Sequence, residues 1–322
     1  MISDLKLVLC DSVSMWEELL TNSPQGTRYA SPAVINALGC EVDNWLVLNK
    51  NQIVAGVPVI TSNRASHGLP MHSYYIGLMY HKDIYKGKEN RKTECEIAIS
   101  EFVMDELSKV YDCVEFSLHH SISDVRGFDW FNYHSPENGR AKISPQYTAI
   151  SNLQPLSDIR AQARSSRRRE EGYAKTREGL HFFMNGTAEE LVELYRQTFV
   201  RQSLEVSESE LQVTMQFASY LLSQQLGEIA VVRDGAGAAQ AAGLLFYDLS
   251  GFVHIPVVGT LETKYGGTLL YFQMMEYAAN KGFEYMDFNG ANSPSRGYFK
   301  HSVGAKAQLF FHVSWQKPVN SN

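Results

Sequence analysis

The organisation of this chain is clearest near its C-terminal end, which reads Tyr285-Met286-Asp287-Phe288-Asn289-Gly290 and then Ser295-Arg296-Gly297-Tyr298-Phe299-Lys300-His301-Ser302-Val303-Gly304-Ala305. The first segment is typical of a strand that runs into a glycine turn. The second is typical of a short helix, but its polar side chains are dense for an element that only packs. We therefore expect a functional site where this strand, turn and helix meet.

The polar residues of these segments suit acyl transfer to an amine. That reaction needs a deprotonated amine, stabilisation of a tetrahedral oxyanion and a proton for the leaving group. Tyr298 is a candidate for the proton donor, and Lys300 with the Phe299 backbone for stabilising the reacting carbonyl. Asp287 and Asn289 are candidates for orienting the acceptor at the mouth of the strand. The alternative is that Tyr298 and Phe299 are core residues and Lys300 is solvated.

A second candidate site lies upstream, where an apolar strand leads into a helix expected over residues 269–280. Gly266 and Gly267 stand at this junction and allow backbone amides to approach an anion, while the helix N-terminus adds partial positive charge. A pyrophosphate would fit, with Lys264 and Thr268 completing the predicted donor site. The alternative is that the two glycines merely turn the chain.

Pro256 interrupts the strand expected over residues 252–258. Proline cannot donate a hydrogen bond to a strand ladder, so we expect a bulge or an edge at this position. Neighbouring backbone groups would then be free to pair with an extended ligand, such as a pantetheine arm.

The order of these motifs resembles the C-terminal half of the Fem-type peptidyl transferases and their FemAB-like acyltransferase relatives. In that family a strand ending in Asp-Phe-x-Gly precedes Tyr-x-Phe-Lys-x-x-x-Gly or a close variant. Here the motifs read Asp287-Phe288-Asn289-Gly290 and Phe299-Lys300-His301-Ser302-Val303-Gly304. The resemblance is most specific over about residues 240–311. It implies two tandem GNAT-like domains and transfer of an activated acyl group to an amine, with the Phe-Lys pair beside the reacting carbonyl.

Two departures from the family bear on the donor. Peptidyl transferases often insert a long helical hairpin in the second domain, and the helices expected between residues 187 and 226 are too short for one. Transfer RNA is therefore possible as a donor carrier but not favoured. The GNAT pyrophosphate pattern, Arg/Gln-x-x-Gly-x-Gly/Ala, is only partly matched by Glu262-Thr263-Lys264-Tyr265-Gly266-Gly267.

An arginine-rich segment resembles the basic helix that opens the second GNAT unit of the family, and we expect one helix over about residues 158–178. Near i, i+4 and i+7 spacing, one helix face can present several guanidinium groups to a phosphate of the donor or acceptor, those of Arg160, Arg164, Arg167 and Arg168. Arg164 and Arg168 are the candidates for binding it. Glutamates interrupt the charge, so an exposed and partly paired helix is an equally good interpretation.

The fold class predicted is α+β, or mixed α/β, because both halves combine antiparallel hairpins with helices. At 322 residues the chain is long enough for two domains. We expect an N-terminal GNAT-like domain at residues 1–153, forming the acceptor site, and a C-terminal one at residues 154–322, binding the donor and carrying the chemistry.

The composition limits the classes of binding partner that we expect. The net charge of −6 opposes broad attraction to nucleic acid or an anionic membrane surface. The four cysteines form no CxxC pair and the ten histidines no close ligand spacing, so no metal is expected. The N-terminus lacks signal-peptide features and no apolar run is long enough to span a bilayer, which predicts a cytoplasmic protein without membrane insertion. The oligomeric state is left open.

The sequence thus predicts an N-acyltransferase that uses acetyl-CoA or another acyl-CoA. The acceptor would be an amine of a small molecule, a sugar nucleotide or a peptide-like precursor. Two alternatives stay open: an aminoacyl-tRNA-dependent peptidyl transferase acting on a cell-wall precursor, and a non-catalytic ligand-binding protein with a GNAT-like fold.

Overall fold

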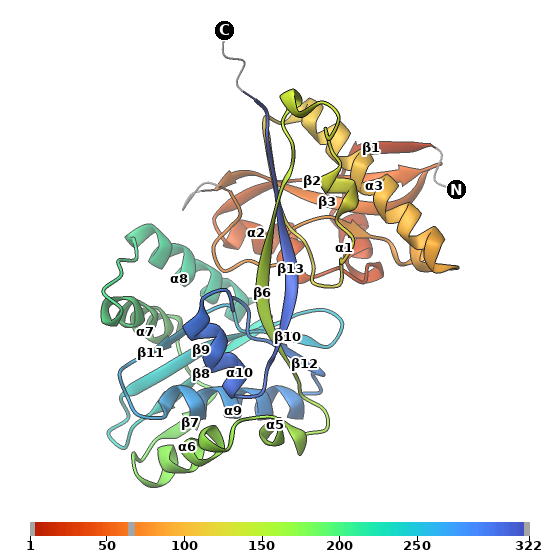
Figure 1. Ribbon diagram of the computed structural model, residues 1–322. Helices are drawn as coiled ribbons and strands as arrows, with labels where there is room; N and C mark the ends of the chain where they lie inside the picture. The colour runs from red at the N-terminus through yellow and green to blue at the C-terminus, as the bar shows by residue number, and fades with distance from the viewer. Residues whose placement is uncertain (1–3, 64–67, 319–322) are drawn as a thin grey trace. The chain divides into compact units, whose positions relative to one another are not determined.

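The computed structural model describes residues 4–63 and 68–318 (Figure 1). The chain forms two compact units, Met1–Gln146 with Leu309–Asn322, and Tyr147–Gln308. The sequence places the division after residue 153 and assigns everything later to the second domain. The structure differs because the long strands β6 (Lys142–Asn152) and β13 (Lys306–Gln316) each run from one unit into the other.

The first unit is built on an antiparallel sheet with the strand order β1-β2-β3-β4. These strands are Leu5–Leu9, Cys40–Asn49, Gln52–Asn63 and Met79–Tyr80. The turn between β2 and β3 consists of Lys50 and Asn51, both with positive φ, which is the geometry of a tight hairpin whose twist matches its strands. In a separate pairing, β5 (Cys113–Ser117) runs antiparallel to the end of β13. The last strand therefore belongs to the first unit over these residues.

The main helix of the first unit is α3 (Glu89–Val110). It buries Ile99, Val103, Met104 and Leu107 at helical spacing. The other helices of this unit are α1 (Val13–Asn22), α2 (Pro32–Ala37) and α4 (Arg126–Asp129), with 3₁₀ turns at Arg28–Ala30, Lys82–Tyr85 and Pro136–Asn138.

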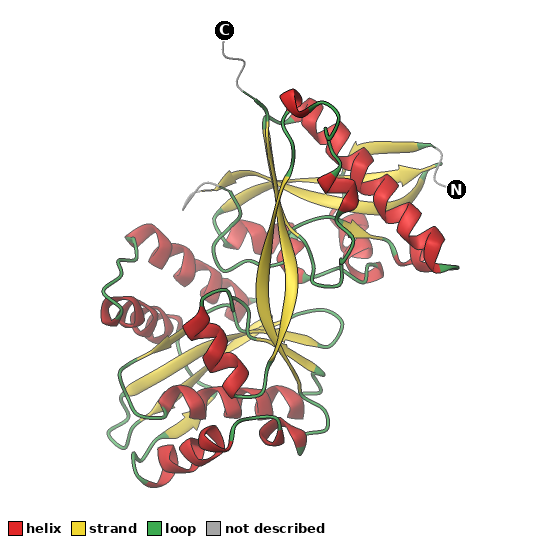
Figure 2. Cartoon of the chain, viewed as in Figure 1, coloured by secondary structure: helices red, strands yellow, loops and turns green. Residues whose placement is uncertain are grey.

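The second unit has a sheet with the strand order β6-β12-β10-β9-β8-β7. Figure 2 colours the strands and helices of the chain by type. The further strands of this sheet are β7 (His181–Phe183), β8 (Gly227–Arg233), β9 (Ala239–Tyr247), β10 (Phe252–His254), β11 (Val258–Thr260) and β12 (Tyr285–Asp287). Only β10 and β12 pair in parallel, and β11 pairs antiparallel with β9. The combination of a mixed sheet with helices confirms the predicted mixed α/β class.

Helices cover both faces of this sheet. The helices α7 (Ala188–Arg201) and α8 (Glu208–Ser223) lie on one face, and α9 (Gly266–Asn280) with α5 (Asp158–Ala161) and α6 (Ser165–Thr176) on the other (Figure 1). Reciprocal capping boxes, Thr187 with Glu190 and Ser207 with Glu210, start α7 and α8. Apolar residues of α9 form the centre of the core, and the short helix α10 (Pro294–Ser302) follows β12.

The single basic helix predicted over residues 158–178 is wrong in one respect, since the chain breaks it into α5 and α6. Arg164 has an extended backbone between them, and its N–H donates to the Ser302 carbonyl at 3.0 Å. A hydrogen bond to another helix replaces the intrahelical bond, so the helix stops and restarts. This break fixes the start of α6 beside the end of α10.

A close approach between α7 and β11 generates the first testable prediction. A Cβ atom at Gly259 would lie 2.3 Å from the backbone of Leu194 and Tyr195, whereas one at Gly172 in α6 meets nothing within 4 Å. We expect Gly259→Ala to lower the free energy of unfolding by about 2–3 kcal/mol. Gly172→Ala is the control and should raise it by about 0.5–1 kcal/mol. Urea unfolding of both variants measures this, and equal effects would contradict the packing described.

Candidate functional site

The parallel strands β10 and β12 separate from each other at the centre of the sheet of the second unit. The N–H of Ile255 donates to the Asp287 carbonyl at 2.9 Å, and this is the last bond between the two strands. After Pro256 the chain continues as β11 along β9. Beyond β12 the chain stays beside β6, its other partner, and the Phe288 N–H bonds the Ala149 carbonyl at 2.9 Å. The interruption expected at Pro256 is therefore present, and we call the opening between β11 and residues 288–290 the fork.

One backbone position of β11 is directed to the fork. The carbonyl of Val257 accepts from the Leu244 N–H of β9 at 2.9 Å. Because backbone groups alternate along a strand, the N–H and C=O of Val258 point away from β9. Two residues further on, the Thr260 N–H is bound by the Thr198 hydroxyl of α7 at 2.8 Å. Helix α7 thus covers the end of β11 and leaves Val258 at the fork.

The loop before α9 has the geometry of an anion-binding turn. Tyr265 precedes the helix in a left-handed conformation, with φ of 69°, and makes no side-chain cap. It stands where the GNAT pattern has its first glycine. A Cβ at Gly266 would lie 2.9 Å from Thr263 Oγ1, but one at Gly267 would meet nothing nearer than 3.8 Å. Gly266 is therefore needed by the turn, while a Cβ at Gly267 would make only ordinary contacts, with Phe299 and Thr260.

Thr268, a predicted donor residue, is joined to Glu170 and Arg167 of α6. Its hydroxyl donates to Glu170 at 2.9 Å, and Glu170 accepts from Arg167 at 2.6 Å. Arg167 also donates to Ser302 at 2.8 Å and lies over the Phe299 ring, 4.8 Å from its centroid. One guanidinium thus ties α6 to the start of α9 and to α10.

The two arginines selected from the sequence have other surroundings. The guanidinium of Arg164 stacks on the Tyr298 ring at 4.5 Å and donates to its hydroxyl. Arg168 is exposed, and one of its nitrogens lies 3.5 Å from the Arg160 carbonyl. Lys264, from the predicted donor site, is exposed as well. Only Arg164 among the three is held in place by a catalytic candidate.

Lys300 is buried rather than solvated. Its Nζ donates to the carbonyl oxygens of Phe288 and Gly290, each at 2.8 Å, and to that of Asn289. Burial lowers the pKa of Lys300 to about 8, although the Asp287 charge opposes that shift. All three N–H donors of the ammonium are occupied by the turn after β12. Tyr298 is 53% exposed and points elsewhere, so the two predicted catalytic side chains do not meet.

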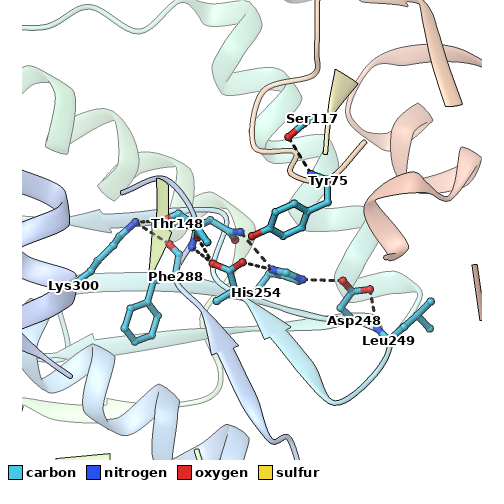
Figure 3. Close-up of polar contacts among 10 residues, drawn as sticks. Tyr75, Ser117, Thr148, Asp248, Leu249, His254, Phe288 and Lys300 are labelled. Carbon is cyan, nitrogen blue, oxygen red and sulfur yellow. Dashed lines mark hydrogen bonds and ion pairs between the residues drawn. The ribbon is translucent and has the colours of Figure 1, made fainter. Parts of the chain in front are cut away.

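A buried histidine that the sequence argument missed lies beside the fork (Figure 3). His254 Nε2 is 2.8 Å from Asp248, and its Nδ1 is 3.6 Å from Asp287. Burial alone would lower the pKa of His254, but hydrogen bonds and charge from both aspartates outweigh it and raise the pKa to about 9. The ring is therefore an imidazolium near neutral pH.

Asp287 and Asn289 are inside this cluster and not at a solvent-exposed mouth of the strand. The Asp287 carboxylate accepts from the Thr148 hydroxyl and from the Asn289 N–H, the latter at 2.8 Å. Their exposures are 0% and 1%. No group of three or more His, Cys, Asp or Glu within residues 4–63 and 68–318 is arranged to hold a metal ion. Over the same ranges, no helix has the length and apolar character needed to cross a membrane.

Comparisons with known proteins agree with this geometry. Residues 157–300 match the family model described as acetyltransferase (GNAT) domain. FemX has a TM-score of 0.66 at 12% identity, over 95% of this chain and 96% of its own. A tandem GNAT protein from the clavulanic acid biosynthesis pathway has a TM-score of 0.55 at 12% identity, over 98% and 100%. L-PGS from Bacillus licheniformis has a TM-score of 0.53 at 14% identity, over 96% and 93%.

Residues 157–300 are therefore similar to GNAT acetyltransferase domains. The whole chain has the fold of Fem-like and tandem GNAT proteins, which confirms the resemblance indicated by its motifs. No curated protein is matched at a significant level.

The imidazolium of His254 predicts a pH dependence of stability. Its pKa is raised from 6.5 to about 9 in the folded protein. Its stabilising contribution is therefore complete below pH 6.5 and is lost as the pH rises through 9. Between about pH 6 and pH 10, the wild type should lose about 3 kcal/mol more unfolding free energy than His254→Gln. Urea unfolding across this range measures the difference, and parallel curves would contradict the assignment.

Arg167 and Arg168 form a matched pair for a third prediction. Arg167→Gln removes bonds that join α6 to α10 and leaves Glu170 without its cation, so unfolding free energy should fall by about 1–3 kcal/mol. Arg168→Gln changes an exposed side chain and should stay within about 0.5 kcal/mol of the wild type. Thermal and urea unfolding of both variants measure this. Equal losses would mean that Arg167 does not join the helices.

Proposed function

We propose that this chain is an N-acyltransferase that takes an acyl group from acyl-CoA and transfers it to an amine, with the donor bound by the second unit. The observation that carries the proposal is the fork between β11 and residues 288–290, directly before an uncapped helix N-terminus. An extended thioester with an anionic end would fit these two features in this order. Their occurrence within a GNAT domain supports this donor.

The residues available suit the donor's phosphates. The amides of Gly266, Gly267 and Thr268 stand at the N-terminus of α9, where partial positive charge favours an anion. The absence of a side chain at Gly267 leaves room for the phosphate to approach. Thr263 Oγ1 is buried in the same loop, without a hydrogen-bond partner among the described residues. A small adjustment of the loop would offer this hydroxyl to the phosphate. Lys264 would add charge from its exposed position.

The chemistry follows from the backbone of the fork. The acceptor nitrogen, as a free amine, attacks the thioester carbonyl. The C–N bond forms as the carbonyl electrons move to oxygen, and the Val258 N–H is the donor best directed to stabilise that oxyanion. Collapse then breaks the C–S bond and releases the coenzyme A thiolate. Proton transfers remove one proton from the nitrogen and return one to sulfur.

The side chains have different parts in this scheme. We retain Tyr298 as the candidate proton donor to the thiolate, with its hydroxyl held by Arg164. Lys300 supports the turn after β12 through three carbonyl oxygens, and the Phe299 ring packs beside the Arg167 guanidinium. Asp287 and Asn289 would act on the acceptor through the shape of that turn. The acceptor classes that we propose are amines of small molecules, sugar nucleotides or peptide-like precursors.

Donor binding gives the fourth prediction. Coenzyme A at about 100 times its dissociation constant should add roughly 2.7 kcal/mol to the stability of the folded protein. Gly267→Leu fills the space before α9 without a backbone clash, so it should fold normally and lose most of this ligand effect. Gly235→Leu is the control, because that turn glycine also has open surroundings and lies in the β8–β9 connection. Thermal unfolding with coenzyme A, acetyl-CoA and no ligand measures the effect.

The outcomes separate the competing functions. A coenzyme A effect that Gly267→Leu abolishes supports the proposal, and release of free thiol from acetyl-CoA with an added amine then tests catalysis. No effect at millimolar ligand would overturn the acyl-CoA donor. Salt-sensitive binding of aminoacyl-tRNA would then favour the peptidyl-transferase alternative. Ligand binding without transfer to any amine would favour a non-catalytic role.

A further inference from the structure

Four buried charges of alternating sign run through the base of the fork. Three of them are labelled in Figure 3: Asp248, after β9; His254, the last residue of β10; and Lys300, in α10. The fourth is Asp287, the last residue of β12. The side chains of the first three are at most 2% exposed, and Lys300 is 9% exposed. Buried charges are costly unless they are paired, so each member depends on its neighbours.

His254 joins the chain through its two ring nitrogens, which have different partners. Nε2 is bound to Asp248 at 2.8 Å. Nδ1 faces Asp287 at 3.6 Å and lies 3.4 Å from the side-chain amide of Asn289. His254 and Asp287 are also opposite each other at the last position of the parallel ladder. The imidazolium is thus placed where the strands separate.

The turn after Asp287 has an unfavourable backbone conformation that these charges hold. Asn289 has φ of 51°, in the left-handed region that costs a non-glycine residue about 1 kcal/mol. From one side, Asp287 accepts from the Asn289 N–H at 2.8 Å. From the other, the Lys300 ammonium binds the carbonyl oxygens of residues 288–290. The turn is therefore fixed between a carboxylate and an ammonium.

We infer that His254 is a positioning residue for acyl transfer: through Asp287 it holds the turn Phe288–Gly290 as the wall of the fork that faces the donor thioester. This inference rests on the proposed function, because the turn matters for catalysis only if the thioester lies in the fork. The positioning depends on the contact between His254 Nδ1 and Asp287. The Nε2–Asp248 contact fixes the ring and is needed for stability.

The two ring nitrogens allow a matched pair of variants. The amide of His254→Gln reaches the position of Nε2 and keeps the contact with Asp248, but loses the contact with Asp287. The amide of His254→Asn overlaps Nδ1 and does the opposite. Both variants remove the positive charge of His254, so a difference between them cannot come from the loss of charge alone. Thr148→Val removes a hydroxyl that donates to Asp287 and serves as a third variant if His254→Gln does not fold.

Two measurements on the full chain test whether His254 holds the turn through Asp287. Hydrogen exchange of peptides spanning residues 287–290 should be faster in His254→Gln and in Thr148→Val than in His254→Asn. Steady-state transfer from acetyl-CoA should show kcat lowered about 10–100-fold in His254→Gln, with KM for acetyl-CoA within about twofold, and kcat within about threefold of wild type in His254→Asn.

Equal exchange rates in the two His254 variants, or equal losses of kcat, would overturn the inference. A loss of kcat that follows unfolding free energy across all three variants would mean that the cluster is only structural. If the wild type binds no coenzyme A and transfers no acyl group, the proposed function fails. The exchange measurement then still decides whether His254 holds the turn.

Discussion

The arrangement of the second unit depends on a backbone constraint at Pro256. By strand alternation the missing N–H of Pro256 would face β9, and the pairing with β9 shifts by one residue between His254 and Val258. The chain bulges at this point, and the last bond to β12 is made by Ile255. Each strand keeps the partner on its other side: β11 pairs with β9, as β10 does, and Phe288 bonds to β6, as β12 does. The opening lies between these two pairs of strands, and the helix N-terminus of α9 follows β11 after a short loop.

Parting two strands at the centre of a sheet leaves polar groups to be satisfied. In this chain the base of the opening is closed by charge rather than by apolar packing. Asp248, His254, Asp287 and Lys300 alternate in sign and come from four separate elements. Such a set is less stabilising than well-packed apolar residues of similar volume would be. What it provides is a defined geometry for a turn that has an unfavourable left-handed residue.

At the proposed donor site, too, single side chains contact several elements at once. Arg167 contacts Glu170, Ser302 and Phe299, so one guanidinium connects the starts of α6 and α9 with α10. The side-chain bonds of Arg167 are made within the protein, which leaves the phosphate-binding role that we propose to the amides at Gly266–Thr268. Tyr298 and Arg164 form a separate pair at the surface. The residues that hold the helices together are therefore different from those that are candidates for contacting a ligand, although the two kinds lie close together in the sequence.

The sequence by itself determined the class of this protein. Strand, turn and helix patterns, capping residues and the Asp-Phe-x-Gly and Phe-Lys-x-x-x-Gly motifs are encoded in neighbouring residues, so they predict the mixed α/β fold and the GNAT resemblance without tertiary contacts. Only the tertiary structure decided which polar groups meet. His254 faces Asp287 through strand register, Lys300 turns inward to three carbonyl oxygens, and β13 pairs with β5 far along the chain. These pairings depend on burial and on contacts between distant segments, which no local pattern of residues specifies.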